Sequence, residues 1–454
     1  MSAAATVFDS HELLKAIWAY QVGTYEDFLP LQRLPSLTFQ RRDRDMALPV
    51  ANLATIHSLL TPWYAQNGLV RLPLLLRAMP QTKCALLAHA ASVGDLPVLQ
   101  VVFSSTSRGV ALASLMANLV DIAAAAGHLH VLEFLERQGH CGYTSHTLRF
   151  AAFAGQLSLL ERFASLAESS DAIHQLFGPQ LMDWAAAGGQ LDVVQWLHAT
   201  RTEGCTSNAI NLAATHGHVH VLAWLTAHRT EGCTSRAVAG AAANGHLACV
   251  EYLYDRGTWT DKCPTYGIDM AAANGHLEVV HYLLARDLAT ETPLSMDLAA
   301  KNGHLEVLQY LHTHVGSHGC TVDALDAAAG NGHLEVVQYL TEHCHAVATS
   351  RAMDRAAANG HLGVVQYLHD HRLEGCTTNA MTMAALHGHL DVVQWLREHR
   401  REGCVAWALH FAKDAAVVAY LQEMPPEFVQ EFYGLGLDRI LDDEERRRNA
   451  ELGM

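Results

Sequence analysis

Residues 270–283 read MAAANGHLEVVHYL, and this stretch is the unit that the chain repeats. An Ala-Ala pair precedes Asn-Gly-His, and an apolar run follows the histidine. The same arrangement recurs around ten glycines: Gly127, Gly155, Gly189, Gly217, Gly245, Gly275, Gly303, Gly332, Gly360 and Gly388. Most neighbouring pairs are 28 positions apart, as in Gly189 to Gly217, and the widest gap runs from Gly155 to Gly189. A nearly fixed period of this size predicts a stacked array, in which each unit buries its apolar surface only against its neighbours.

Each unit is predicted to be a helix, a turn and a second helix. An apolar residue seven before the glycine and the Ala-Ala pair four and three before it share one helical face. The glycine, often preceded by asparagine, ends that helix in a left-handed conformation. Apolar residues two, four, five and eight after the glycine define the second helix, as in Leu334, Val336, Val337 and Leu340. Threonines that precede the first helices are predicted N-caps: Thr206, Thr234, Thr321 and Thr377.

The skeleton Ala-Ala-x-x-Gly-His-Leu-x-Val-Val-x-x-Leu resembles the ankyrin repeat, over about three quarters of the chain. The resemblance implies an all-α helix-turn-helix solenoid that binds proteins. Residues 90–102 and 408–421 look like further units, so we expect 11–12 in all. The usual ankyrin unit has about 33 residues and opens with Thr-Pro-Leu-His. Since the period of this chain is shorter and that tetrapeptide is absent, we expect short or absent β-hairpin fingers.

Three segments are expected: a helical N-terminal cap (1–80), the repeat array (81–424), and a C-terminal capping helix with a charged tail (425–454). Further helices are predicted near residues 53–60, 72–79 and 427–441. Residues 12–20 also faintly resemble the opening helix of an F-box, although the usual Leu-Pro before it is missing. That resemblance implies an alternative function, a substrate-recruiting adapter of a ubiquitin ligase.

Composition favours a soluble, intracellular protein, and we expect a monomer located in the cytoplasm. The net charge of −16 disfavours nucleic-acid and anionic-membrane partners. The N-terminal residues lack the basic and apolar regions of a secretory signal. Ten cysteines are interpreted as reduced thiols, because packed helices lie about 8–10 Å apart, beyond disulfide reach.

No catalytic, cofactor or metal site is predicted. Most of the thirty histidines are dispersed, and eight follow the repeat glycine, where the family resemblance implies a turn-stabilising hydrogen bond. Two tighter groups lack HExxH or paired CxxC spacing: His312, His314, His318 with Cys320, and His343, Cys344 with His345. Phosphate-binding loops and nucleophile elbows are also missing from the sequence. We therefore predict a non-enzymatic scaffold.

The predicted binding surface is a concave ribbon on the first helices. Positions nine, six and two before each glycine lie within about 60° of one another on a helix. The predicted protein-binding residues are Asn208, Arg236, Tyr266, Asp323 and Arg351 (nine before), Asp269, Asp297, Asp326 and Asp354 (six before), and Lys301 (two before). The aspartates would make an acidic line that prefers a partner with a basic or mixed-polarity segment. The alternative is that each aspartate serves only its own helix terminus.

Overall fold

The computed structural model describes residues 26–35, 52–104, 119–139, 143–256, 265–286, 293–315, 320–344 and 346–423, except the side chains of residues 26, 265, 266 and 315. Within these ranges the chain is built of helices and turns, with no extended strand. Contacts divide the chain into two units, each described by itself below. Unit 1 is Met1–Ala237 with Tyr252–Thr260, and unit 2 is Val238–Glu251 with Asp261–Met454.

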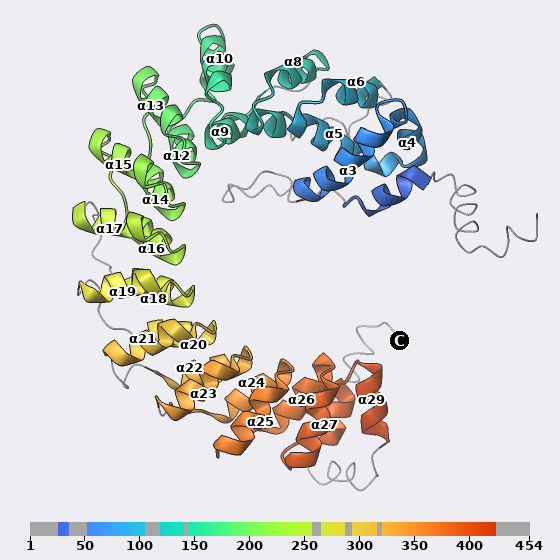
Figure 1. Ribbon diagram of the computed structural model, residues 1–454, viewed down its shortest axis with the longest axis vertical. Helices are drawn as coiled ribbons and strands as arrows, with labels where there is room; N and C mark the ends of the chain where they lie inside the picture. Colours follow the sequence, from blue (N-terminus) through green and yellow to red (C-terminus); the bar gives the residue numbers. More distant parts are fainter. Residues whose placement is uncertain are drawn as a thin grey trace, which may run out of the picture. The chain divides into compact units, whose positions relative to one another are not determined.

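Unit 1 begins with short helices and continues into helix pairs (Figure 1). Its elements are η1 (Glu26–Arg33), α3 (Leu53–Asn67), α4 (Leu72–Ala78), η2 (Pro80–Thr82), α5 (Lys83–Val93), α6 (Leu96–Ser104), α8 (Leu129–Arg137), α9 (Ser145–Phe153), α10 (Leu157–Ala167), α11 (Asp171–His174), α12 (Gln180–Ala187), α13 (Leu191–Thr200), α14 (Ser207–Thr215) and α15 (Val219–His228). Helices α16 (Ser235–Ala243) and α17 (Leu247–Arg256) contain residues of both units.

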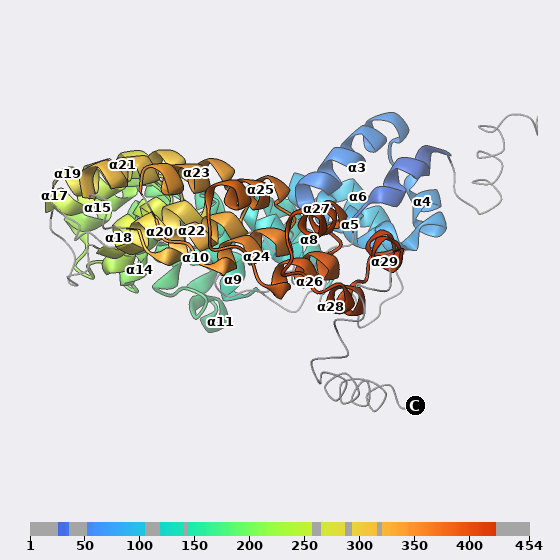
Figure 2. The ribbon, with the colours of Figure 1, turned by 90° about the horizontal axis from the view of Figure 1, so that it is seen from below.

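Unit 2 consists of helix pairs throughout its described part. They are α18 (Thr265–Ala273), α19 (Leu277–Ala285), α20 (Pro293–Lys301), α21 (Leu305–Val315), α22 (Val322–Gly330), α23 (Leu334–Glu342), α24 (Ser350–Ala358), α25 (Leu362–His371), α26 (Thr378–His387), α27 (Leu390–His399), α28 (Val405–Phe411) and α29 (Ala415–Gln422). The first helices from α18 to α26 pack in one row, and the second helices from α19 to α27 form another beside it (Figure 2). The predicted all-α helix-turn-helix solenoid is confirmed.

Burial follows the repeat pattern. In the unit around Gly332, the pair Ala328–Ala329 is fully buried between first helices, and Val336, Val337 and Leu340 are buried beneath the second row. Alanine has no side chain beyond Cβ, so two helices can approach closely there. Each helix pair covers its apolar face with the next pair. The hydrophobic core is therefore continuous along the helix pairs of unit 1, and likewise along those of unit 2.

The repeat glycine is left-handed, as predicted. Gly332 has φ of 80°, and the next residue donates its backbone N–H to the oxygen of Ala328, 3.0 Å away. A Cβ on Gly332 would also lie 2.6 Å from Nδ1 of His361 in the following repeat. The position therefore needs glycine both for its backbone conformation and for the ring packed against it.

Several of the histidines that follow the repeat glycine bond to the preceding repeat, which the family resemblance did not imply. Nε2 of His276 lies 3.0 Å from the carbonyl oxygen of Ala243, and Nε2 of His304 lies 3.0 Å from that of Ala273. Where glutamine replaces histidine, its amide does the same: Gln156 Nε2 donates to Ala125 O at 3.2 Å. These contacts join neighbouring helix pairs rather than stabilising one turn.

Several predicted segments lie outside the described residues. These include the F-box-like residues 12–20 and the C-terminal helix at 427–441, so the adapter function stays a prediction. The helices expected near 53–60 and 72–79 correspond to α3 and α4, and α3 packs against α5. The described helices include none that is both long enough and apolar enough to cross a bilayer.

We predict that Gly332→Ala destabilises the protein by about 2–3 kcal/mol, from the left-handed backbone and from displacement of the His361 ring. Gly139→Ala is the matched control, because Gly139 also has φ of 80° but has no atom within 4 Å of a built Cβ. It should cost only about 1–2 kcal/mol. Urea denaturation of both variants measures the difference, and equal losses would contradict the ring contact.

Titration of His361 is expected to make stability pH-dependent. Burial lowers the pKa of His361, and the neighbouring His333 and His389 lower it further. The pKa of His361 is lower in the folded protein than in the unfolded chain. The contribution of neutral His361 to the free energy of unfolding is therefore fully present above about pH 6.5 and is lost as the pH falls below that value. His361→Gln introduces the residue that another repeat has at this position, Gln156. The variant should show a smaller fall in melting temperature between about pH 8 and about pH 5, which lie about 1.5 units either side of the ordinary histidine pKa. An unchanged fall would assign the effect to other groups.

Candidate functional site

The aspartates six before the glycine do not form an open acidic line. Asp326 is 1% exposed, and its carboxylate accepts the backbone N–H of Thr349 at 3.0 Å and the hydroxyl at 2.6 Å. Asp269, 5% exposed, accepts the hydroxyl of Ser295. The expectation that these two carboxylates face solvent is wrong, because both point into the next repeat.

The other two predicted aspartates are half-buried and engaged in the same way. Asp297 accepts both donors of Thr321 at 3.0 and 2.7 Å, and Asp354 accepts both donors of Thr377 at 2.7 Å. Burial raises the pKa of Asp297, while the donors from Thr321 oppose that rise. The alternative was that each aspartate interacts only with the terminus of its own helix. The observed hydrogen bonds instead run from one repeat to the next.

The threonine in each pair has two functions. The hydroxyl oxygen of Thr349 accepts the N–H of Arg351 at 3.1 Å, so it caps α24 while its own hydroxyl hydrogen goes to Asp326. The predicted N-caps Thr206, Thr321 and Thr377 are confirmed by the same bond, and Thr234 accepts from Arg236 at 3.3 Å. We call this contact the carboxylate–threonine clamp. At one step Asn211 replaces the aspartate and bonds Thr234 through both amide atoms, each at 3.0 Å.

Most described residues nine before the glycine are exposed, whereas the residues two before it are mostly buried or half-buried, as Ala273 and Gly330 are, and Lys301 is an exposed exception. Asn208 and Arg236 are exposed, and in unit 2 so are Lys301, Asp323 and Arg351. Tyr266 lies within α18, but its side chain is outside the described part. Sequence reasoning missed the position five before the glycine, where Arg355 and Met383 are also exposed. That position lies four residues after the ninth and hence on the same helix face, which is the signal that could have found it.

We define the first-helix strip of unit 2 as the exposed residues Leu294, Lys301, Asp323, Arg351, Arg355, Asn379 and Met383. Three of these side chains are basic and one is acidic. The predicted preference for a basic or mixed-polarity partner segment depended on the aspartates, and the oxygens of Asp297, Asp326 and Asp354 accept hydrogen bonds from the next repeat. The described strip is of mixed polarity with a basic excess.

A second contact between repeats joins loop residues that are 24 positions apart. Arg229 bonds the thiol of Cys205, and Arg400 bonds the thiol of Cys376. Both arginines also form an ion pair with the glutamate two residues later, Glu231 and Glu402 respectively. Arg372 and Glu374 form the same ion pair at 2.5 Å. We call this series the loop ladder. Burial raises the pKa of the Cys376 thiol to about 11, so these thiols are protonated and poorly nucleophilic at neutral pH.

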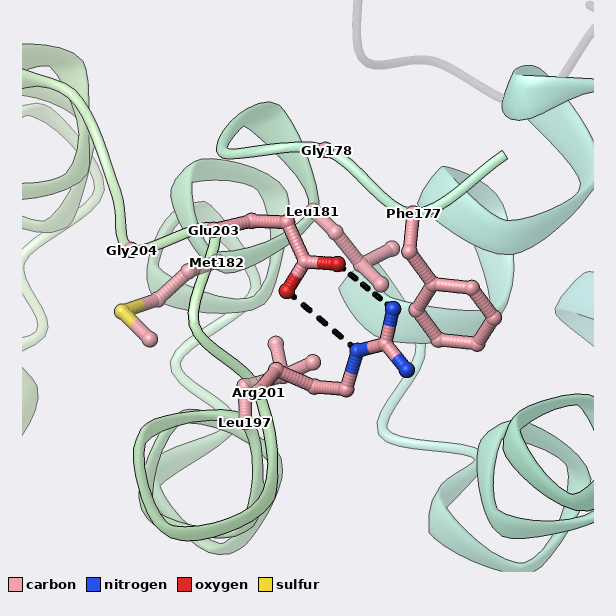
Figure 3. Close-up of a pocket in the computed structure, with 8 residues that line it drawn as sticks. All are labelled: Phe177, Gly178, Leu181, Met182, Leu197, Arg201, Glu203 and Gly204. Atoms are coloured by element: carbon pink, nitrogen blue, oxygen red, sulfur yellow. Dashed lines mark hydrogen bonds and ion pairs between the residues drawn. The ribbon is translucent and has the colours of Figure 1, made fainter. Parts of the chain in front are cut away.

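In unit 1 the loop ladder borders a small hollow (Figure 3). The guanidinium of Arg201 lies 4.4 Å from the ring centre of Phe177, and Arg201 pairs with Glu203 at 2.5 Å. Phe177 precedes Arg201 by the same spacing as Cys205 precedes Arg229. Leu181 also lines the space, whose cavity volume is about 10 Å³. That is about the room of a single water molecule, and the arginine already has a carboxylate partner. The hollow is therefore a packing feature of the ladder rather than a ligand site.

Metal and cofactor ligands do not cluster in the part of the chain that the structure describes. No group there brings together three or more of His, Cys, Asp and Glu in a way that could hold a metal ion. Of the two histidine groups noted in the sequence, His312 is hydrogen-bonded to the hydroxyl of Tyr339 at 2.9 Å, and His343 stacks on that ring. His318 and His345 lie outside the described residues.

Helix pairs with an alanine interior, a left-handed glycine and bonds to the next pair define a helical repeat solenoid. A family model described as ankyrin repeats (3 copies) matches residues 268–352, and one described as ankyrin repeats (many copies) matches residues 182–226, 240–284 and 353–397. Residues 182–226 and 240–397 of this chain therefore consist of ankyrin repeats. Such repeats form protein–protein interaction domains, and proteins that carry them are typically non-enzymatic scaffolds.

The crystal structure of the human ASB11 ankyrin repeat domain matches with 22% sequence identity and a TM-score of 0.30, over 36% of this chain and 82% of that chain. Among curated proteins, none matches.

We predict that Asp326→Ala destabilises the protein by about 1–3 kcal/mol, because it leaves two half-buried donors of Thr349 without an acceptor. Asp326→Asn should cost less than about 1 kcal/mol, since Asn211 already makes this clamp. Asp323→Ala removes the same charge from an exposed position of α22 and is the matched control. Urea denaturation compares the three, and an Asp326→Ala loss no larger than that of Asp323→Ala would exclude the clamp.

Proposed function

We propose that this ankyrin-repeat chain is an interaction scaffold that binds a protein partner through the first-helix strip of unit 2. One observation carries the proposal: the interior of every unit is nearly the same, whereas the exposed positions differ from unit to unit. Nine before the glycine stand Leu294, Asp323, Arg351 and Asn379 in successive units. Repeats that vary only at exposed positions present a different contact at each step, which is what recognition of one partner needs.

The strip is available for binding. Within the described residues, the side chains of Arg351 and Arg355 form no hydrogen bond or ion pair, in contrast to the arginines of the loop ladder. These two arginines lie one turn apart on α24. Arg355 packs over Gly330 of α22, because a Cβ added to Gly330 would lie 3.0 Å from the Cβ of Arg355. Gly330 thus makes room for the stem of Arg355, which supports its guanidinium at the surface.

The composition of the strip indicates the kind of partner. Arginine and methionine are enriched at protein interfaces, and arginine is a frequent energetic hot spot. Arg351, Arg355 and Lys301 supply positive charge, Asp323 supplies negative charge, and Leu294 and Met383 supply exposed apolar area. We infer a partner segment with carboxylates opposite α24 and apolar side chains on either side.

The test is charge reversal on α24. The double variant Arg351→Glu/Arg355→Glu should weaken capture of a partner identified with the wild-type chain by at least about thirtyfold, as expected for a hot-spot loss near about 2 kcal/mol. Affinity is measured by titration with the identified partner, and circular dichroism checks that the variant is folded. Arg401→Glu/Lys413→Glu makes the same charge change at exposed positions outside the strip. Equal affinities for the two double variants would remove the proposal.

A further inference from the structure

The loop ladder has one step that differs in chemistry from the others. Cys344 occupies the arginine position, twelve after its repeat glycine, and Cys320 lies 24 positions earlier. The thiols of Cys320 and Cys344 lie near enough to shift each other's pKa, and the same holds for the Cys205–Arg229 and Cys376–Arg400 pairs. The same spacing thus gives the same contact three times, but at this step both partners are cysteines.

The replacement extends beyond one residue. Where the other steps place the glutamate that pairs with arginine, this step has Ala346, which is buried. The ion pair of the ladder is therefore missing as a whole, and the two thiols meet without a competing charged partner from the ladder. Both cysteines lie outside helices, Cys320 directly before the cap of α22 and Cys344 two residues after α23. The helix spacing that made disulfides improbable from the sequence therefore does not apply to this pair.

We propose that Cys320 and Cys344 form a reversible disulfide that covalently joins two consecutive repeats, with a peroxide as the oxidant. The thiolate of one cysteine attacks the peroxide oxygen, which breaks the O–O bond, forms a sulfenic acid and releases water after proton transfer. The second thiol then attacks that sulfur and displaces a second water. Overall, two thiols and hydrogen peroxide give one disulfide and two waters, and a dithiol reductant reverses the change by thiol–disulfide exchange.

The two thiols influence each other's ionisation. Their contact lowers the pKa of Cys344 and raises that of Cys320, and the nearby Asp297 raises the pKa of Cys320 further. Either sulfur can supply the attacking thiolate, and the other then resolves the sulfenic acid. Cys344 is 6% exposed, an opening suited to a small oxidant such as hydrogen peroxide. A disulfide needs sulfurs about 2.05 Å apart, and both cysteines lie in loops rather than in helices.

The bond would act directly on the surface that carries the proposed function. Cys320 immediately precedes the N-cap of α22, which bears Asp323, and the loop of Cys344 leads into α24, which bears Arg351. Joining these loops holds the two helix N-termini together and so fixes the spacing of neighbouring strip residues. The disulfide itself does not depend on the proposed partner, because its formation is measured on the chain alone.

The test is peptide mapping of the full-length protein after treatment with hydrogen peroxide and alkylation of the remaining thiols. Trypsin leaves both cysteines in one peptide, because residues 302–350 contain no Lys or Arg. Cleavage after glutamate instead separates peptide 307–335, with Cys320, from peptide 343–374, with Cys344. We expect these two peptides to be joined, two hydrogen atoms lighter than their sum, and to separate again after dithiothreitol.

Two controls make the result specific. Cys344→Arg installs the residue that the ladder uses elsewhere, so it should fold and lose the linked peptide. Cys376, whose thiol is bonded to Arg400, should remain alkylated after the exposure that joins Cys320 to Cys344. Oxidation of Cys344 to sulfinic acid without a linked peptide would overturn the proposal. So would oxidation of Cys376 at the same rate.

Discussion

No helix pair in this chain can bury its apolar face alone, and the close approach of successive first helices solves that problem. Fully buried pairs such as Ala328–Ala329 permit the approach, and the polar groups brought together by it must then find partners. These polar groups find partners in the adjacent repeat. The clamp pairs Asp326 with Thr349, and the histidine series pairs His304 with Ala273. Hydrogen bonding therefore follows from packing, because buried polar groups without partners would cost more than the contact gains.

Much of this architecture could be predicted from the sequence, since it depends on local pattern. Apolar spacing marked both helices of each unit, the glycine marked the left-handed turn, and threonines such as Thr321 marked the caps. The candidate surface was predicted less well. Periodicity places Asp326 and Asp323 on one helix, but it cannot tell that one is buried against Thr349 and the other is exposed. That distinction depends on a residue 23 positions away, which only the packed neighbour brings into contact.

The structure separates two kinds of variation among the units. Interior substitutions preserve a contact, as when glutamine replaces histidine at Gln156 or asparagine replaces aspartate at Asn211. Substitutions at the exposed positions change charge and polarity from repeat to repeat, as in the series from Leu294 to Asn379. The step at Cys320 and Cys344 belongs to neither kind, because it keeps the contact while changing its chemistry from a thiol beside a guanidinium to a pair of thiols. Such a step indicates a role beyond filling space.

The bonds of the clamp and of the histidine series reach only the adjacent unit, and this has a consequence for how the chain can change in length. Each repeat contains one acceptor, one donor and one glycine turn. They are placed so that the acceptor of one repeat meets the donor of the next. Tandem duplication of such a block in the gene would create a new junction whose polar groups already match. Loss of one block would likewise rejoin equivalent ends, so the array can grow or shrink by whole units without new interior residues.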